Sequence, residues 1–424
     1  MIKIRLNLRK VVAIAICLAG MTTMTAQNAD IYAAGGVGGL GKVWKNNVEL
    51  YSVADGINDV SFNCIYVSGN DVYTGATIST NINGWEYHPI IWKNGKLLYE
   101  LETTDNFGFI DDIYVSGGDV YACGSENSHA SNAVVWKNGK LVYTLCEGYY
   151  NKSTDYLYYY ANTIQVIGND VYVAGYSSGS NNNSHPGWCC KNETVLYSIG
   201  GASFNDIVVS KNDVYIAGSG LNSSGIQVPK VWKNGVELYS EENGDFRSIN
   251  ILGNDVYVSG YKRIVAKDVA TVWKNGTVFN QLIASTDDTN GITGARANDI
   301  WVINNDVYVL TNYRYISQSI IWKNNAELYK MVNQSVNTLF VLSPNNANID
   351  NIEIHNLQIY PNPVKNELFI QSKTDIDRIE IYSIAGKQMF SVNLTDAKSI
   401  NVSELPTGIY VLKIGDYTEK FIKE

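Results

Sequence analysis

A nine-residue phrase recurs seven times along this chain of 424 residues and limits the folds it can adopt. Its clearest copy, VWKNGVELY, occupies residues 231–239, and further copies begin at residues 43, 91, 135, 189, 272 and 321. Self-similarity at a period of 20–50 residues is the signature of repeat architectures. The anchor position of the phrase falls at Trp44, Trp92, Trp136, Cys190, Trp232, Trp273 and Trp322.

Each copy is accompanied by two other short phrases. NDVYVAG (residues 169–175) has relatives at residues 28, 70, 118, 212, 254 and 305, and a phrase such as DIYVSG (residues 112–117) precedes nearly every copy. All three phrases are rich in β-branched and aromatic residues, which favour strands. Two residues such as Gly69-Asn70 or Asn94-Gly95 separate the strands, and these pairs favour two-residue hairpin turns. Each repeat therefore predicts four antiparallel strands.

Four strands in a period of this length are typical of one blade of a β-propeller. The prediction is an all-β fold with a seven-bladed β-propeller at residues 27–343. The first repeat lacks its first strand, and the last repeat is followed by a spare strand, NTLFVLS (residues 337–343). We expect this strand to pair with ADIYAAG (residues 29–35) and close the ring, which would remove the open sheet edges. The repeated Trp residues are then scaffold rather than ligand contacts.

The two ends of the chain indicate export. Residues 1–26 have a basic stretch, an apolar stretch and a small-residue cleavage point, the pattern of a signal peptide. The formal net charge is −9, and removing residues 1–26, with four basic and no acidic residues, lowers it to −13. Such acidity argues against nucleic acid as a partner. No apolar run in the mature chain is long enough for a transmembrane helix.

The five cysteines of the mature chain do not follow the repeat and predict no disulfide framework. They are Cys64, Cys123, Cys146, Cys189 and Cys190. One interpretation is that they are buried thiols that replace other small or apolar residues. A bridge between some pair is the alternative in an oxidising compartment, and the sequence does not identify the pair.

The repeated phrases end at a polar linker, residues 344–353, and a different sequence pattern follows. Short alternating strands between turns bearing Pro and Gly predict a small immunoglobulin-like β-sandwich at residues 354–424. YPNPV (residues 360–364), IYSIAGKQM (residues 381–389), LPTGIYVLKI (residues 405–414) and the basic end KFIKE resemble the type A C-terminal sorting domain of type IX secretion cargo. That resemblance implies recognition by the type IX machinery and a protein secreted from, or attached to, the outer surface of a Gram-negative cell.

Variable loops on a rigid scaffold are where binding usually occurs. In this chain the variable connections all lie at one end of the predicted blades, because the opposite end has only two-residue turns. Aromatic residues with polar groups on these loops are candidates for stacking on sugars or anchoring a protein. The alternative is that they pack on their own loops. With one neighbouring arginine, the candidates are Trp85, Tyr87, Tyr156, Tyr158, Tyr313 and Arg314.

A second set of candidates comes from the start of each predicted first strand, where a pair of mostly polar residues recurs. We call these seven pairs the polar ring: residues 63–64, 111–112, 162–163, 205–206, 247–248, 298–299 and 337–338. Oxygen-bearing side chains around a channel mouth could hold a cation or a hydroxyl-rich ligand. Alternatively, Asn and Asp hydrogen-bond the backbone where a loop becomes a strand. The binding candidates in the ring are Asp112, Asp206, Arg247 and Asp299.

These patterns favour a binding module for a glycan or a surface protein. The alternatives are a glycan-cleaving enzyme, for which Asp112, Asp206 and Asp299 are the candidate acids, or a structural surface component. The four histidines have no zinc-site spacing, and neither a nucleophile elbow nor a phosphate-binding loop occurs. We therefore predict no catalytic residue, metal site or cofactor.

Overall fold

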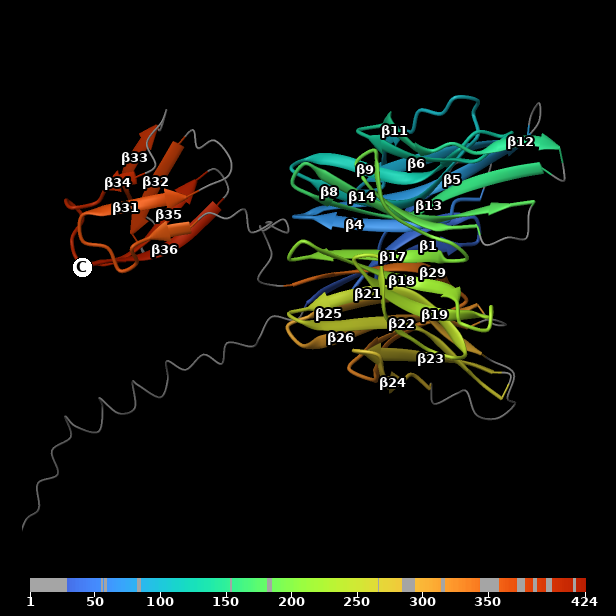
Figure 1. Cartoon of the computed structure of the whole chain (residues 1–424). Coiled ribbons are helices and arrows are strands. Elements are labelled where there is room, and N and C mark those ends of the chain that lie inside the picture. The colour runs from blue at the N-terminus through green and yellow to red at the C-terminus, as the bar shows by residue number, and fades with distance from the viewer. Residues whose placement is uncertain are drawn as a thin grey trace, which may run out of the picture. The chain divides into compact units, whose positions relative to one another are not determined.

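The computed structural model divides into two compact units, residues 1–350 and residues 351–424. All secondary structure in the described residues is β-strand, which confirms the all-β prediction (Figure 1). The structure describes residues 29–54, 56, 59–81, 85–152, 155–180, 185–265, 267–283, 294–313, 317–343, 358–371, 378–383, 387–393, 399–414 and 417–424. The predicted signal peptide, the linker and Arg314 lie outside these residues.

The described part of the larger unit contains seven antiparallel sheets, one for each sequence repeat. Sheet 1 consists of β29 (Ser335–Leu342), β1 (Asp30–Val37), β2 (Leu40–Lys45) and β3 (Val48–Val53). Sheet 2 consists of β4 (Cys64–Ser68), β5 (Asp71–Asn81), β6 (Trp85–Lys93) and β7 (Lys96–Glu100). Sheet 3 consists of β8 (Gly108–Ser116), β9 (Asp119–Glu126), β10 (Asn132–Lys137) and β11 (Lys140–Cys146).

Sheet 4 has five strands, and sheets 5 to 7 have four each. Sheet 4 consists of β12 (Tyr149–Lys152), β13 (Asp155–Ile167), β14 (Asp170–Gly179), β15 (Gly187–Lys191) and β16 (Thr194–Ile199). Sheet 5 consists of β17 (Ser203–Ser210), β18 (Asp213–Leu221), β19 (Gln227–Lys233) and β20 (Val236–Ser240). Sheet 6 consists of β21 (Gly244–Leu252), β22 (Asp255–Ile264), β23 (Lys267–Lys274) and β24 (Thr277–Gln281). Sheet 7 consists of β25 (Ala295–Ile303), β26 (Asp306–Tyr313), β27 (Gln318–Lys323) and β28 (Ala326–Val332).

One strand from each sheet faces the neighbouring sheets, and we call these seven the inner strands. In sheet order they are β29, β4, β8, β13, β17, β21 and β25. Each inner strand contacts the next one in this series, and β25 contacts β29, so the series closes on itself. This arrangement of four-stranded antiparallel sheets is consistent with the blades of a propeller. The count of seven blades stays an interpretation.

The pairing of the last strand of the larger unit with its first strand is confirmed. Strand β29 runs antiparallel to β1, with Leu339 opposite Ala33 and Val341 opposite Ile31. Figure 1 shows the blue β1 beside the orange β29, although about 300 residues separate them in sequence. Leu339, Val341 and Val336 are buried among residues of sheets 1 and 7. The C-terminal strand therefore completes a sheet and its core at once.

The repeated phrases are explained by one local arrangement, seen clearly in sheet 2. Lys93 Nζ lies 2.7 Å from Asp71 Oδ2 and 5.2 Å from the ring centre of Tyr73. Asn94 donates to Asp71 Oδ1, and its own Oδ1 accepts the backbone N–H of Val72. Asn94 and Gly95 both have positive φ, as the tight turn requires. The same Lys–Asp ion pair recurs in all seven sheets.

The anchor side chains of the repeat form the core, as predicted. All seven are buried, including Cys190 where the other copies have Trp. Neighbouring aromatic rings pack on several of them: the ring centres of Phe246 and Trp273 are 4.8 Å apart, and those of Phe204 and Trp232 are 5.0 Å apart. These tryptophans are scaffold because each one fills the space between two sheets.

Two segments expected to be loops are strands instead. Strands β5 and β6 continue the hairpin out to Asn81 and Trp85, so Trp85, Tyr87 and His88 lie on β6. Residues 149–152 and 155–167 form the hairpin of β12 and β13, which gives sheet 4 its fifth strand. The alternation of Tyr156, Tyr158 and Tyr160 on β13 is the period of a strand. The high aromatic content of both segments is compatible with strand pairing.

The smaller unit is a β domain of two sheets. One contains β30 (Gln358–Tyr360), β31 (Glu367–Gln371) and β34 (Ser399–Asn401). The other contains β33 (Gln388–Asn393), β32 (Arg378–Ser383), β35 (Gly408–Ile414) and β36 (Tyr417–Lys423). Leu368, Ile381, Leu412 and Phe421 belong to one buried cluster that both sheets share. The domain thus has its own core.

The closing strand can be tested by the full-length Leu339→Ala variant. Leu339 is buried between sheets 1 and 7, so its truncation leaves a cavity and should lower the free energy of unfolding by about 2–5 kcal/mol. The matched control is Val332→Ala, because Val332 is exposed on the neighbouring β28 and its truncation should change little. Denaturant titration of both variants measures the difference. Equal stability of the two variants would contradict the closing role of β29.

Candidate functional site

The polar ring lies along the inner strands, at the start of β4 and two to seven residues inside the other six. The prediction that these pairs lie at the strand starts is correct only for β4, because the other inner strands begin earlier than their repeated phrases. In six of the seven inner strands the first residue of the pair is a bulge that interrupts the register with the next strand. The second residue of the pair returns to the ladder, as Asp112 does opposite Cys123. A bulge redirects a side chain locally. Here it directs two consecutive polar side chains toward the neighbouring sheet.

The three aspartates at the second position join alternate sheets to their neighbours. Asp112 of sheet 3 accepts the N–H of Ile164 in sheet 4 at 3.0 Å. The equivalent bonds run from Ile249 to Asp206 at 2.8 Å and from Leu339 to Asp299 at 2.8 Å. Each carboxylate also accepts the N–H of its own following residue. The hydrogen-bonding alternative from the sequence analysis therefore accounts for these contacts.

Hydroxyl groups occupy the second position in sheets 1, 4 and 6, and the thiol of Cys64 occupies it in sheet 2. Ser248 Oγ donates to Asp206 Oδ2 at 2.8 Å and lies 3.2 Å from Asp299 Oδ1. Thr163 Oγ1 lies 3.1 Å from Asp206 Oδ1, and Thr338 Oγ1 lies 3.4 Å from Asp299 Oδ2. Asp206, Asp299 and these hydroxyls thus form one connected network around part of the ring.

Burial raises the pKa of every aspartate in the ring. The pKa of Asp112 and of Asp299 rises to about 7, first because burial disfavours the charged form and then because of other ring carboxylates, although backbone N–H groups oppose the rise. The pKa of Asp206 is also raised by burial, against hydrogen bonds from Ile249 and Ser248. Carboxyls with raised pKa values at one site are typical of functional sites as well as of structural networks.

Asparagines at the first position also join neighbouring sheets. Their side-chain N–H₂ groups donate to the backbone carbonyl that precedes the next sheet's pair. The bonds are Asn63 to Ile110 (3.2 Å), Asn162 to Phe204 (2.7 Å), Asn205 to Phe246 (2.7 Å) and Asn337 to Phe62 (2.9 Å). The first position holds a charged residue in two sheets, Asp111 in sheet 3 and Arg247 in sheet 6.

Asp111 departs from this pattern because an ionised carboxylate has no proton to donate. The equivalent carbonyl, that of Ala161, accepts the Cys123 thiol instead at 3.6 Å. Burial alone raises the pKa of Asp111 to about 7. Its charge also contributes, after burial, to the raised pKa of Tyr176 on sheet 4. A residue that lacks the inter-sheet hydrogen bond made by the equivalent asparagines is a candidate for a functional rather than a structural role.

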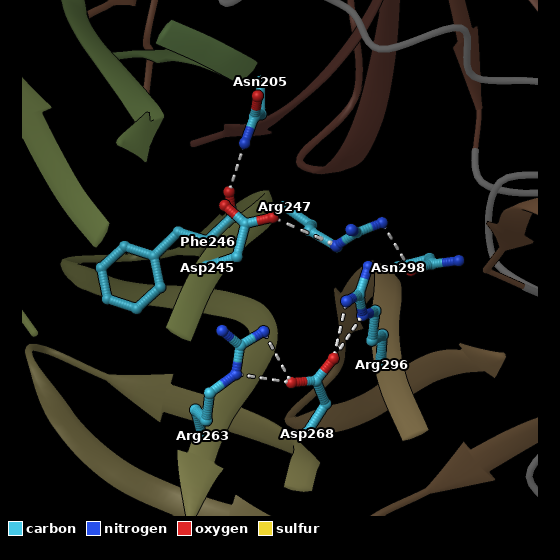
Figure 2. A network of polar contacts seen from close by, with 8 residues as sticks. All are labelled: Asn205, Asp245, Phe246, Arg247, Arg263, Asp268, Arg296 and Asn298. Atoms are coloured by element: carbon cyan, nitrogen blue, oxygen red, sulfur yellow. Dashed lines mark hydrogen bonds and ion pairs between the residues drawn. The ribbon is translucent and has the colours of Figure 1, made fainter. Parts of the chain in front are cut away.

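Arg247 belongs to a network of charges at the same end of sheets 6 and 7 (Figure 2). Its Nη1 donates to Asn298 Oδ1 at 3.0 Å, and its Nε lies 3.3 Å from Asp245 Oδ2. Below it, Asp268 accepts two hydrogen bonds from Arg263 on one oxygen and two from Arg296 on the other. Burial would raise the pKa of Asp268, but the bonds from Arg296 and Arg263 outweigh it and hold that pKa below its ordinary value.

The three guanidinium groups surround one aromatic ring. The ring centre of Tyr261 lies 4.5 Å from Arg296 Cζ, 5.6 Å from Arg263 Cζ and 5.8 Å from Arg247 Cζ. The Asp268 side chain is only 4% exposed, so both of its arginine partners are held in place. This cluster combines fixed positive charge with an aromatic face in an otherwise acidic chain, and it suits an anionic or ring-shaped ligand group.

Sheet 4 contributes a line of tyrosines. Tyr156 and Tyr158 share one face of β13, with ring centres 5.0 Å apart, and Tyr150 of β12 lies 6.3 Å from Tyr156. Closer to the polar ring, Tyr160 stacks on Tyr176 of β14 at 4.9 Å. The described members of β13 are half-buried, whereas Tyr150 is exposed. The line leads from the tip of the hairpin toward Asp111.

Sheet 2 contributes a second aromatic group. Trp85 is 62% exposed and lies 6.4 Å from Tyr87, with nearly parallel rings. Tyr87 packs at 4.8 Å on both Phe107 and Phe109 at the start of sheet 3. Tyr87 thus supports the hairpin, as the packing alternative predicted, whereas Trp85 presents most of its surface to solvent.

The prediction of an exposed Tyr313 was wrong. Tyr313 is the last residue of β26, is 6% exposed and belongs with Ile320 and Leu282 to the core cluster between sheets 6 and 7. The strand continues two residues beyond the repeated phrase at residues 305–311, and the apolar neighbours bury the ring.

Sequence reasoning missed Tyr176, Arg263 and Arg296, and it placed Asp111 in the polar ring without selecting it as a binding candidate. A signal for the arginines was present, because the four arginines of residues 27–343 all fall between positions 247 and 314.

The residues that the structure describes contain no group of three His, Cys, Asp or Glu side chains arranged to hold a metal ion. The same residues include no helix of the length and apolarity needed to cross a membrane. Residues 358–424 match the family model of the secretion system C-terminal sorting domain. No curated protein matches the chain. The predicted resemblance of the tail is confirmed, and it indicates export by the type IX system.

The raised pKa of Asp111 gives a pH-dependent stability. The group titrates near 3.8 when unfolded and near 7 when folded, so its stabilising effect is complete below pH 3.8 and is lost as the pH rises through 7. The melting temperature of the larger unit should therefore fall between pH 5 and pH 8. Asp111→Asn should melt higher than wild type at pH 8 and show a shallower fall, because asparagine is never charged.

Asp119→Asn is the control for this experiment. The ion pair with Lys137 holds the pKa of Asp119 below its ordinary value, so this group stays charged throughout the range. The control should keep the wild-type slope. A slope for Asp111→Asn equal to that of wild type, measured by thermal melts, would show that Asp111 does not titrate in this window.

Proposed function

We propose that the protein is a secreted or cell-surface binding module, a seven-bladed β-propeller that grips a glycan or a surface protein with its polar-ring end. The sorting domain implies interaction with the type IX machinery. We further propose that a signal peptide at residues 1–26 begins this export, and that the mature chain stays on, or is released from, the outer membrane of a Gram-negative cell.

The observation that carries the binding proposal is the pair of lengthened hairpins in sheets 2 and 4. A sheet of four short strands satisfies the repeat, yet β5–β6 and β12–β13 extend beyond it and display aromatic residues. Trp85 is 62% exposed, Tyr149 46% and Tyr150 50%. Large aromatics left in solvent contribute nothing to the core and are typical of recognition surfaces.

A second candidate function, glycan cleavage, is favoured by one observation. Asp111, Asp112 and Asp299 have pKa values near 7, the range in which a carboxyl can act as a general acid or base. However, Asp112 and Asp299 already accept backbone N–H groups on both oxygens. Asp111 is therefore the better candidate acid, and loss of hydrolysis in Asp111→Asn would identify an enzyme.

The binding proposal is tested with the full-length chain on an array of glycans and outer-membrane protein extracts. The double variant Trp85→Ala/Tyr150→Ala should bind the best-scoring ligand at least about tenfold more weakly, because both rings are exposed and hot-spot aromatics contribute ~2 kcal/mol or more. Its melting temperature should match that of wild type.

Trp232→Ala is the matched control, because Trp232 is buried and its loss should cost roughly 3–5 kcal/mol of stability without removing a ligand contact. Binding measured on the folded fraction of this control should be retained. Unchanged affinity of the double variant would place the ligand elsewhere, and absence of any ligand on the array would count against the binding role itself.

A further inference from the structure

We propose that Cys146 and Cys190 form a disulfide bond in the exported protein, linking sheet 3 to sheet 4. Both are free thiols in the structure. Cys190 is buried in the core cluster between sheets 3 and 4, Cys146 packs against the same cluster, and the contact between the two thiols shifts the pKa of both. The inference depends on export and is independent of the ligand-binding role.

The residues equivalent to these two cysteines one repeat earlier contact each other at the junction of sheets 2 and 3. Between sheets 2 and 3, Trp136 donates its indole N–H to the backbone carbonyl of Glu102 at 2.6 Å. Glu102 is the third residue after Tyr99 of its repeat, and Cys146 is the third residue after Tyr143 of the next repeat. Cys190 stands where Trp136 stands one repeat earlier. At the junction of sheets 3 and 4, a pair of cysteines therefore replaces the Trp-to-carbonyl contact.

The loss of a tryptophan at position 190 is compensated nearby. Trp188, two residues earlier on β15 and therefore on the same face, is 2% exposed and belongs to the same cluster. Packing at this junction consequently does not depend on a large side chain at position 190. A cysteine at position 190 is therefore compatible with the packing of this junction.

The other described cysteines do not offer an equivalent pair. Cys189 lies on the face of β15 opposite to Cys190 and belongs to the cluster between sheets 4 and 5. Cys64 belongs to the cluster between sheets 2 and 3, whereas Cys123 shares the cluster of Cys190, but its thiol donates to the carbonyl of Ala161 at 3.6 Å. Burial raises the pKa of both thiols, and neither is partly exposed as Cys146 is, so neither can begin the exchange with an oxidant.

Cys146 is suited to react first. It is partly exposed at the end of β11, and the hydrogen bond with Cys190 outweighs burial and lowers its pKa. Its thiolate would attack the disulfide of a protein oxidant in the compartment outside the cytoplasm, forming a mixed disulfide. The contact with Cys146 and burial raise the pKa of Cys190, and formation of the mixed disulfide removes the Cys146 contribution. Cys190 then loses its proton, attacks the Cys146 sulfur and expels the oxidant. Two S–H bonds are lost and one S–S bond forms, and the two electrons and two protons pass to the oxidant, which is reduced to its dithiol.

The test is mass spectrometry of the full-length protein after exposure to oxidised glutathione, with free thiols alkylated before digestion. The expected result is one cross-linked pair of peptides carrying Cys146 and Cys190, with Cys64, Cys123 and Cys189 alkylated. Cys146→Ser and Cys190→Ser should each abolish the cross-link, and Cys189→Ser, the matched neighbour control, should retain it.

Thermal melts give a second readout that needs only the partly exposed position. A reducing agent should lower the melting temperature of the oxidised wild type and leave that of Cys146→Ser unchanged, because the bond restricts the unfolded chain. If Cys146 and Cys190 are both alkylated in the oxidised, folded protein, or if either pairs with another cysteine, the proposal is overturned.

Discussion

The pairing of β29 with β1 is the contact on which the larger unit depends. Without it, β1 would present an open edge, sheet 1 would have three strands, and the core between sheets 1 and 7 would lose Val336, Leu339 and Val341. A long-range pairing of this kind incurs the entropy of closing a loop of about 300 residues, but that cost grows only slowly with loop length. Burial of three aliphatic side chains and a ladder of backbone hydrogen bonds offset it.

The sheets are held to one another by polar contacts as well as by apolar cores. Asp112, Asp206 and Asp299 accept backbone N–H groups of the next sheet, and four asparagines donate to its carbonyls. The repeated residues therefore supply both the polar contacts and the apolar core between neighbouring sheets. Departures from it carry the most information about function: Asp111 and Arg247 in the polar ring, and the two cysteines between sheets 3 and 4. Each places a charge or a thiol at a position where most other repeats have a different kind of side chain.

Much of the fold could be predicted from the sequence, because Asn-Gly turns and β-branched strands act locally and recur seven times. The spare strand at residues 337–343 also revealed the closing pairing. The candidate site was harder to predict from the sequence. Tyr156 and Tyr158 were placed on a loop because their segment joins two repeats, although their alternation is that of a strand. Tyr313 was expected on an exposed loop, yet the core between sheets 6 and 7 buries it. The clamp of Arg263 and Arg296 on Asp268 joins three strands, and such a contact depends on the three-dimensional arrangement rather than on spacing.

The central claim is that the sheets of the larger unit close into one ring through the pairing of β29 with β1. Amide hydrogen exchange of the native, full-length protein tests it most directly, because protection reports the free energy of opening at each strand. The account predicts that the backbone amides of β29 and β1 that pair with each other exchange as slowly as those of the central strands β9 and β18. Exchange of the β29 amides at the rate of a frayed terminus, while β9 and β18 stay protected, would contradict closure.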